Sequence, residues 1–319
     1  MYQLPTPTPT AWRTLREGVL AATMSRELWQ QQRLQGVGAT EAVAVCGLSK
    51  WTTPLLAWQR RKGLAPRPEY NNAMHMGHLL EPIVVKLWEE HTGLTIAPES
   101  EGDILVYAED ATPWRICSPD RWTADGVLLE CKTTAQPVDA DNPPVEWVLQ
   151  LQYQMAVCGA TEGWLAWLVN GRDFGTVRYE RDDTLLESVL PLVDDYWHNN
   201  VLGDVEPAIS NVDDALLKYP SPVEEEMEAS DTLMAKIAEL KELKRMAKEA
   251  EQLASDLEAE VKMQIAQAGR VTYQGSTLLT YTRNKPSTKL DSKRLQAEHP
   301  DLCAAYMVEV EGARVLRLK

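Results

Sequence analysis

The chain has 319 residues, of which 44% are hydrophobic and 25% are charged. These proportions are those of a soluble globular protein, and they exclude a disordered, collagen-like or disulfide-rich chain. The five cysteines are odd in number and contain no CxxC pair, which favours buried thiols over disulfides or a zinc site. No stretch reaches the roughly 18 apolar residues of a membrane span, and the N-terminus lacks the pattern of a secretory signal. We therefore expect a cytoplasmic protein.

The net charge of −15 argues against broad, non-specific binding of nucleic acid. It does not exclude a local basic surface, and residues 50–67 hold five Lys or Arg and no acid. Two interpretations of this segment stay open. In the first, Lys50, Trp51, Arg60 and Arg61 form a surface that contacts DNA. In the second, the segment is an amphipathic helix with buried Trp and solvated Arg.

The expected elements begin with an extended tail over residues 1–24, which contains alternating Pro and Thr. A mixed region of helices and strands follows over residues 25–217. Its apolar patterns predict helices near 79–93, 145–158 and 183–199, and five strands between residues 103 and 180. The order of these elements predicts a mixed α/β fold, with a central mixed β-sheet flanked by helices.

The remaining residues differ in composition from the first region. Residues 218–268 read as a linker and a long amphipathic helix, rich in Glu, Ala, Lys and Leu. Apolar residues recur there every seven positions, which predicts coiled-coil character: Leu240, Ala247, Ala254 and Val261, and likewise Leu243, Ala250 and Leu257. Residues 269–319 predict a small strand-rich tail with one short helix from Leu290 to Glu298 and a second hairpin around Glu311-Gly312.

The candidate chemistry lies in SPDRWTADGVLLECK, residues 118–132. Glu130 and Lys132 alternate along an apolar strand and so share one face, where a charged pair is costly unless it faces a cleft or a metal. Asp120 can return beside Glu130 across a hairpin. Two carboxylates and the backbone carbonyl of Cys131 are oxygen ligands suited to Mg²⁺. The alternative is that Asp120 only caps a turn while Glu130 and Lys132 form an ion pair at the rim.

The motif resembles the PD-(D/E)xK nuclease superfamily, and residues 27–200 resemble its lambda exonuclease and YqaJ-like family. Segments that match this family follow one another in the family's order: ELWQQQRLQGVGATEA (27–42), GLSKWTTPLLAWQRRKG (47–63), NNAMHMGHLLEP (71–82), the Asp120 motif, and VEWVLQLQYQMAVCG (145–159). LDSKRLQAEHPDL (290–302) resembles a segment in the tail of long members. Arg121 departs from the family, which usually has Gly after the motif Asp.

The resemblance implies a restriction-endonuclease-like core that works as a Mg²⁺-dependent deoxyribonuclease, with Mn²⁺ as a substitute. It assigns catalysis to Asp120, Glu130, Lys132 and Gln150, and metal binding to Glu81, Asp120, Glu130 and the Cys131 carbonyl. It implies that Arg33 and Thr40 hold a 5′-phosphate.

The same resemblance implies a 5′→3′ exonuclease that acts on duplex DNA ends in phage recombination and leaves 3′ single strands. Such enzymes form homotrimers and work with a single-strand annealing protein in the cytoplasm of the bacterial host. Two alternatives stay open, namely an endonuclease with the same core and a DNA-binding or assembly protein without activity.

Overall fold

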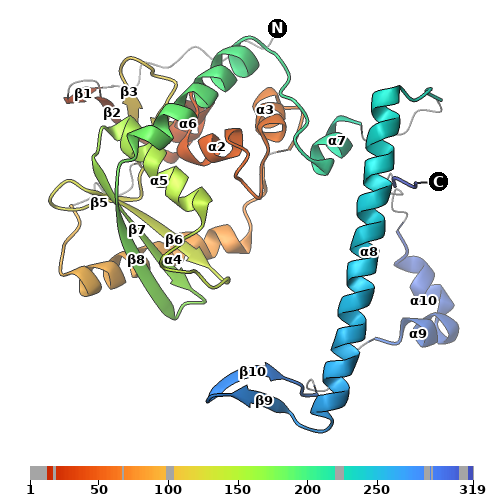
Figure 1. The fold of residues 1–319 in the computed structure, drawn as a ribbon. Coiled ribbons are helices and arrows are strands. Elements are labelled where there is room, and N and C mark those ends of the chain that lie inside the picture. Colours follow the sequence, from red (N-terminus) through yellow and green to blue (C-terminus); the bar gives the residue numbers. More distant parts are fainter. Residues whose placement is uncertain are drawn as a thin grey trace. The chain divides into compact units, whose positions relative to one another are not determined.

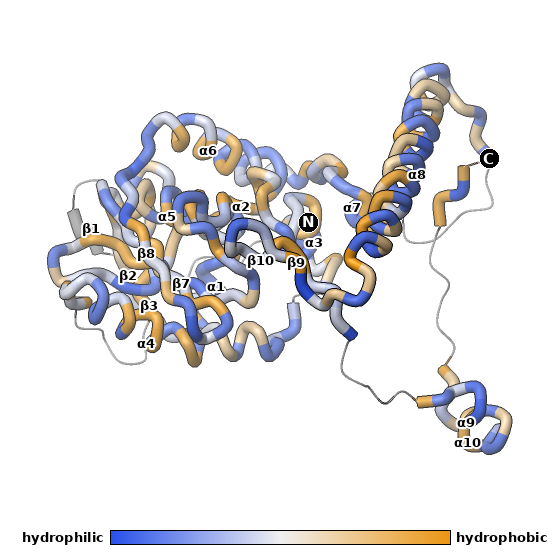
Figure 2. The backbone as a smooth tube through the Cα atoms, turned by 60° about the horizontal axis from the view of Figure 1, so that its bottom comes forward, coloured by the Kyte–Doolittle hydropathy of each residue, from blue (hydrophilic) through white to orange (hydrophobic). Residues whose placement is uncertain are grey.

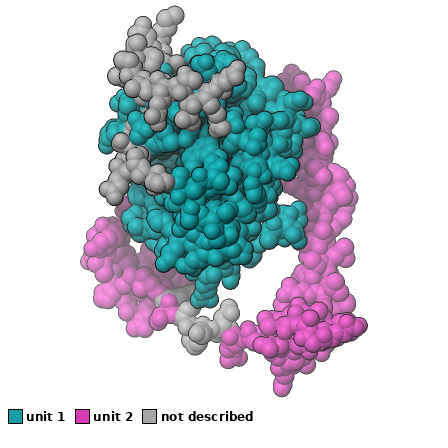
Figure 3. Space-filling model, turned by 90° about the vertical axis from the view of Figure 1, so that its left-hand side faces the viewer, with its two compact units in different colours: residues 1–218 teal, residues 219–319 magenta. Residues whose placement is uncertain are grey.

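The computed structural model describes residues 13–16, 19–66, 68–97, 104–219, 226–283, 288, 290–308 and 315–318. The chain divides into two compact units, residues 1–218 and residues 219–319, which are coloured separately in Figure 3. No helix among the described residues is both long and apolar enough to span a membrane.

The first sheet of unit 1 has four antiparallel strands in the order β1-β2-β3-β4. Its strands are β1 (Arg13–Arg16), β2 (Val19–Met24), β3 (Ile104–Glu109) and β4 (Ile116–Cys117). The prediction of an extended tail over residues 1–24 is therefore wrong from Arg13 onward, while residues 1–12 lie outside the described residues. The strands form because β2 pairs along its whole length with β3, and Ala21 is fully buried beneath that pairing.

The second sheet is mixed, as predicted. Its strands, in the order β5-β6-β7-β8, are β5 (Arg121–Trp122), β6 (Leu128–Thr134), β7 (Glu162–Val169) and β8 (Asp173–Glu180). β6 runs parallel to β7, and the other neighbours are antiparallel. Two adjacent parallel strands need a crossover connection, and helix α5 (Val145–Cys158) provides it.

Helices cover both faces of this second sheet (Figure 1). Leu128 and Leu165 belong to the core that includes α5, whereas Leu129 and Ala166 pack with Val84 of α4 (Asn72–Thr92). Alternate residues of a strand point to opposite faces, so α4 and α5 lie on opposite sides. The same alternation places Glu130 and Lys132 on the α5 side. The expected mixed α/β core is thus confirmed.

Helix α5 is the centre of unit 1. Its buried residues cover almost the whole circumference between Leu149 and Cys158, as expected of a helix enclosed on all sides. They share one core with Tyr107 and Cys117 of the first sheet and with the second sheet. The remaining elements of unit 1 are α1 (Arg26–Gln32), η1 (Arg33–Gln35), α2 (Ala39–Val45), α3 (Pro54–Lys62), α6 (Asp183–Asp195), the π-helical turn η2 (Tyr196–Leu202) and α7 (Val212–Lys218).

Unit 2 contains the predicted long helix, α8 (Asp231–Ile265), whose N-terminus is capped by Ser230. Hydrophobic and hydrophilic residues alternate along α8 (Figure 2), and none of its residues is buried. The hairpin of β9 (Arg270–Tyr273) and β10 (Ser276–Thr280) follows as predicted.

The rest of the tail is helical rather than strand-rich. Asp291 caps α9 (Ser292–Glu298), and Pro300 begins a second helix that the sequence did not predict, α10 (Pro300–Ala305). Proline suits the first turn of a helix because its missing N–H would be unpaired there anyway. The hairpin predicted around Glu311-Gly312 and most of the predicted linker lie outside the described residues.

Candidate active site

The predicted catalytic residues come together in unit 1. Glu130 and Lys132 project from β6 toward α5, and Gln150 and Gln154 lie one turn apart on the facing side of α5. Asp120 immediately precedes β5, the antiparallel neighbour of β6. The local hairpin therefore returns Asp120 beside the end of the apolar strand, as the sequence predicts.

Glu130 is buried, with only 2% of its surface exposed. Its Oε1 accepts hydrogen bonds from Lys132 Nζ at 2.5 Å and from Gln150 Nε2 at 2.6 Å. Its Oε2 accepts one from Gln154 Nε2 at 2.9 Å, and Lys132 Nζ also donates to Gln150 Oε1 at 2.9 Å. A buried carboxylate is stable only with such partners, so these four side chains form one connected network.

Lys132 is held in its charged form. Burial acts to lower the pKa of Lys132, but the negative charges of Glu130 and Asp120 outweigh it and raise the pKa. The ammonium group therefore stays protonated at neutral pH. This favours orientation of a water and neutralisation of charge by Lys132 over removal of a proton from that water.

Asp120 has a different environment. Its Oδ2 accepts a hydrogen bond from the backbone N–H of Cys131 at 2.8 Å. Burial raises the pKa of Asp120 well above its usual value, and the charges of Glu130 and Glu81 raise it further. In a strand the N–H and C=O of one residue point to the same side, so the carbonyl of Cys131 also faces Asp120.

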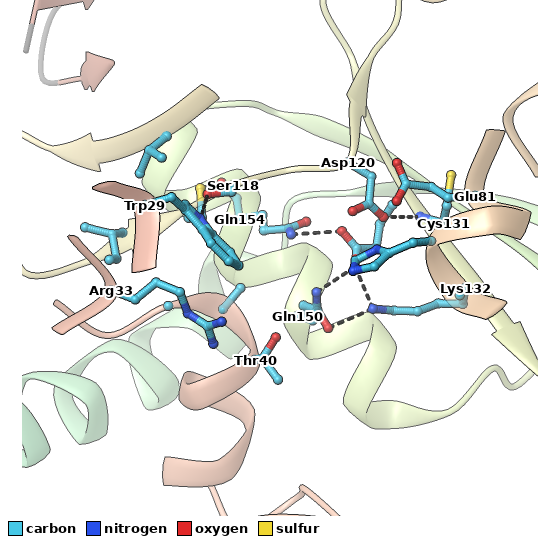
Figure 4. Close-up of a pocket in the computed structure, with 18 of the residues that line it drawn as sticks. Trp29, Arg33, Thr40, Glu81, Ser118, Asp120, Cys131, Lys132, Gln150 and Gln154 are labelled. Carbon is cyan, nitrogen blue, oxygen red and sulfur yellow. Dashed lines mark hydrogen bonds and ion pairs between the residues drawn. The ribbon is translucent and has the colours of Figure 1, made fainter. Parts of the chain in front are cut away.

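These groups line one pocket of about 460 Å³, shown in Figure 4. Asp120, Glu81 and Lys132 lie on one side of the pocket, Arg33 and Thr40 lie on the other, and Gln150 is between them. The structure thus places together eight of the predicted residues: Arg33, Thr40, Glu81, Asp120, Glu130, Cys131, Lys132 and Gln150.

Arg33 is supported by residues that sequence reasoning missed. Its guanidinium lies 4.9 Å from the ring centre of Trp29, and Trp29 Nε1 donates to Ser118 Oγ at 3.0 Å. A cation over an indole face is attracted by the ring, so Trp29 helps to orient Arg33. The sequence offered one signal that Gln154 belongs to the site. It lies four positions after Gln150, which places both side chains on one helix face. No local signal joins Trp29 to Ser118, which are 89 positions apart.

The predicted basic surface is only partly present. Arg61, with 8% of its side chain exposed, is paired with Glu41 and donates to Gly36 O at 2.5 Å. It is therefore a structural residue, and its assignment to DNA binding is wrong. Trp58 is buried, as the amphipathic-helix interpretation expects, but Arg61 is not solvated as that interpretation also expects.

The other basic-surface residues stay closer to solvent but outside the pocket lining. Arg60 donates to Thr52 Oγ1 at 3.0 Å and to Pro66 O at 3.3 Å. Lys50 and Trp51 are exposed, and Lys50 Nζ lies 2.8 Å from Glu146 Oε1. Lys50 and Trp51 are thus accessible from solvent, and their assignment to DNA binding stays a prediction.

The residues present fit a hard divalent cation. In the part of the chain that the structure describes, no three His, Cys, Asp or Glu side chains form a ready metal-ligand cluster. Nevertheless, Asp120, Glu130 and the Cys131 carbonyl offer the oxygen donors that Mg²⁺ prefers. Burial, together with the charges of Glu130 and Glu81, raises the pKa of Asp120, and a bound cation would offset these effects. Gln154 Oε1, which is buried beside Glu130, has no hydrogen-bond partner among the described residues.

Comparison with known proteins finds a family model that matches part of the chain. Residues 28–161, which contain the whole Asp120 motif and both glutamines, match the YqaJ-like viral recombinase domain. We call residues 28–161 the YqaJ-like domain after this match. The similarity extends beyond this domain, because the protein YqaJ of Bacillus subtilis strain 168 is 29% identical over 307 residues, covering 90% of this chain and 93% of that protein.

Two solved structures are also similar to this chain. An alkaline exonuclease from Laribacter hongkongensis has 23% sequence identity and a TM-score of 0.43, covering 56% of this chain and 93% of that one. A phage related exonuclease from Haemophilus somnus 129PT has 14% identity and a TM-score of 0.41, covering 53% and 96%.

Proposed function

We propose that the YqaJ-like domain is a Mg²⁺-dependent deoxyribonuclease that hydrolyses phosphodiester bonds at duplex DNA ends. The observation that carries this proposal is the convergence of Asp120, Glu130, Lys132 and Gln150 in one pocket. The match of residues 28–161 to the YqaJ-like viral recombinase domain supports it. Asp120, Glu130 and the Cys131 carbonyl would hold the cation, which would supply Lewis-acid stabilisation of charge on a phosphate. Mn²⁺ would serve as a substitute.

The chain's own residues supply the rest of the reaction. The Lys132 ammonium, fixed by Glu130 and Gln150, presents a positive charge to a phosphate oxygen and orients the attacking water. Such preorganised charge is worth several kcal/mol because it needs no rearrangement during the reaction. The amide of Gln150 offers a second hydrogen-bonding group on the same wall of the pocket.

Exonuclease action from the 5′ end is the form of the activity that we favour. Arg33 and Thr40 line the wall opposite the carboxylates, and both are exposed to solvent at the pocket. A guanidinium suits a terminal phosphate because it can donate two parallel hydrogen bonds. A 5′-phosphate held there would place the adjoining chain toward Asp120 and Lys132, and digestion would leave 3′ single strands.

We further propose that the chain forms a homo-oligomer, namely the trimer that its resemblance to the lambda exonuclease and YqaJ-like family implies. This assembly would work with a single-strand annealing protein in the cytoplasm of the bacterial host. An assembly with a positive interior would admit DNA despite the net charge of −15. Sedimentation equilibrium of the full chain tests the assembly, since a monomeric mass at micromolar concentration would reject it.

The catalytic assignment is tested with Lys132→Ala and Asp120→Ala in a cleavage assay with Mg²⁺. We expect both variants to lose cleavage while they keep their fold and most of their affinity for DNA. Lys86→Ala, which changes an exposed residue of α4, is the matched control and should cleave normally. Wild-type turnover by either site variant would reject the assignment.

A further inference from the structure

Helix α8 has one apolar face, and none of its residues is buried. The heptad pattern of residues 240–257 places apolar side chains along this face: Leu240, Leu243, Met246, Ala247, Ala250, Leu253, Ala254 and Leu257. Leu243, Leu253 and Leu257 remain 56–69% exposed, and hydrophobic residues recur along the length of α8 (Figure 2). The opposite face is polar, where Arg245 pairs with Glu249. A helix with such a stripe gains stability when another surface covers the stripe.

The sizes of the apolar side chains fit a second copy of α8 that runs in the opposite direction. An antiparallel copy centred between Ala247 and Ala250 puts each of these alanines against the other. One turn further along, Leu243 meets Ala254, so a large side chain fills the space beside a small one. A parallel copy would set each residue against itself and stack the alanines in successive layers. The antiparallel arrangement therefore leaves less empty space in the seam.

The charged residues that flank this seam are complementary in the same register. In an antiparallel pair the same edge of both helices meets, and that edge brings Lys244 of each copy beside Glu251 of the other. Both side chains are exposed, and neither takes part in an ion pair within the described part of the chain. At the second edge, Met246 of each copy lies beside Leu253 of the other. The charged edge and the apolar edge thus each face their own kind of partner.

A parallel pairing fits the sequence less well. It would bring Lys244 beside Glu239, which is favourable, but it would also set the apolar Met246 against Glu251. The antiparallel pairing contains one like-charge approach, between Glu239 and Glu260. This approach falls toward the two ends of the paired segment, where both carboxylates stay in water and their repulsion is screened by salt.

We propose that α8 is a pairing helix that binds α8 of a second copy of this chain in an antiparallel, twofold-symmetric arrangement. Both copies use the same surface, so the pairing stops at two helices. The inference goes beyond the proposed trimer and does not rest on nuclease activity. A twofold pair cannot form equally among the three chains of one ring, so in a trimer α8 would join chains of different rings.

Light scattering during size-exclusion chromatography of the full chain measures the pairing. We expect Ala247→Glu, which places a charge at the centre of the seam, to reduce the mass of the wild-type assembly to half. This expectation is the same whether the rest of the chain is trimeric or single. Ala259→Glu introduces the same side chain on the polar face and should keep the wild-type mass. Equal masses for the wild type and Ala247→Glu would overturn the inference.

Two charge reversals test the direction of pairing. Lys244→Glu and Glu251→Lys each set like charges against one another in a pair of identical chains, and each should weaken pairing about tenfold in sedimentation velocity. An equimolar mixture of the two variants restores opposite charges at both contacts, so its affinity should return to within about threefold of the wild type. A parallel pair, or α8 bound to its own chain or to another protein, would not recover on mixing. Single variants that pair normally, or a mixture that fails to recover, would overturn the inference.

Discussion

Asp120→Asn should stabilise the metal-free protein while it abolishes cleavage. The substitution keeps the shape of the side chain and retains an oxygen to accept the hydrogen bond from Cys131 N–H. It removes a carboxyl group whose pKa is raised well above its usual value by burial and by the neighbouring charges of Glu130 and Glu81. A group with a raised carboxyl pKa opposes folding at neutral pH, because ionisation is easier in the unfolded chain.

The size of this effect has an upper limit. At pH 7, the destabilisation that the Asp120 carboxyl causes is limited by the difference between the pH and the ordinary Asp pKa of about 3.9. At about 1.4 kcal/mol per pH unit, this difference of about 3 units gives about 4 kcal/mol. We therefore expect Asp120→Asn to raise the free energy of unfolding by at most about 4 kcal/mol. For a domain of 150–250 residues, each kcal/mol corresponds to an increase in Tm of about 2–4 °C.

Differential scanning calorimetry at pH 7 in EDTA measures the shift. Asp110→Asn, in the exposed loop after β3, is the control and should change stability by less than about 0.5 kcal/mol. Addition of Mn²⁺ should raise the Tm of the wild type and leave that of Asp120→Asn unchanged. A Tm of the metal-free variant at or below that of the wild type would refute the claim that burial and the neighbouring carboxylates make ionised Asp120 oppose folding.

Three further predictions concern other parts of the chain. Arg33→Ala should slow digestion of 5′-phosphorylated duplex more than that of 5′-hydroxyl duplex; equal losses in rate would reject a phosphate-binding role. Burial acts to raise the pKa of Asp194, but hydrogen bonds from Arg115 and Trp114 outweigh it and lower the pKa. The stability that the Asp194 carboxylate contributes is present above its unfolded pKa and is lost as the pH falls below about 4. Asp194→Asn should therefore show a smaller drop in Tm between pH 4 and pH 2 than the wild type. An equal drop in Tm would contradict a stabilising role for the Asp194 carboxylate. Finally, residues 1–218 alone should unfold in one cooperative transition, since, of the residues that the structure describes, all buried hydrophobic ones lie within Val19–Val201. A molten or aggregated fragment in calorimetry would show that unit 2 is needed for folding.

Much of the site was predictable from the sequence because its parts are local. Asp120, Glu130 and Lys132 lie on one hairpin and one strand, where alternation fixes which side chains share a face. The parallel pair of β6 and β7 also follows from the strand-helix-strand order around α5.

Features that depend on distant partners were missed. β1 and β2 were expected as tail because β2, which β1 pairs with, finds its other partner β3 only about eighty to ninety residues further along the chain. Arg61 was expected to face solvent because composition alone does not show that Glu41, on another helix, binds it. Likewise, nothing in the motif indicates that Arg121 reaches Glu81 on α4. Charged residues thus reveal their roles only when their partners in space are known.

One measurement tests the central claim most directly. Purified full-length protein is incubated with Mg²⁺ and with two substrates, a linear duplex labelled at its 5′ end and a covalently closed circle. We predict release of labelled mononucleotide from the linear DNA, an intact circle, and no release by Lys132→Ala. Cleavage of the circle would contradict exonuclease action and indicate an endonuclease. No cleavage of either substrate, with Mn²⁺ as well, would contradict the assignment of Asp120, Glu130 and Lys132 as a nuclease site.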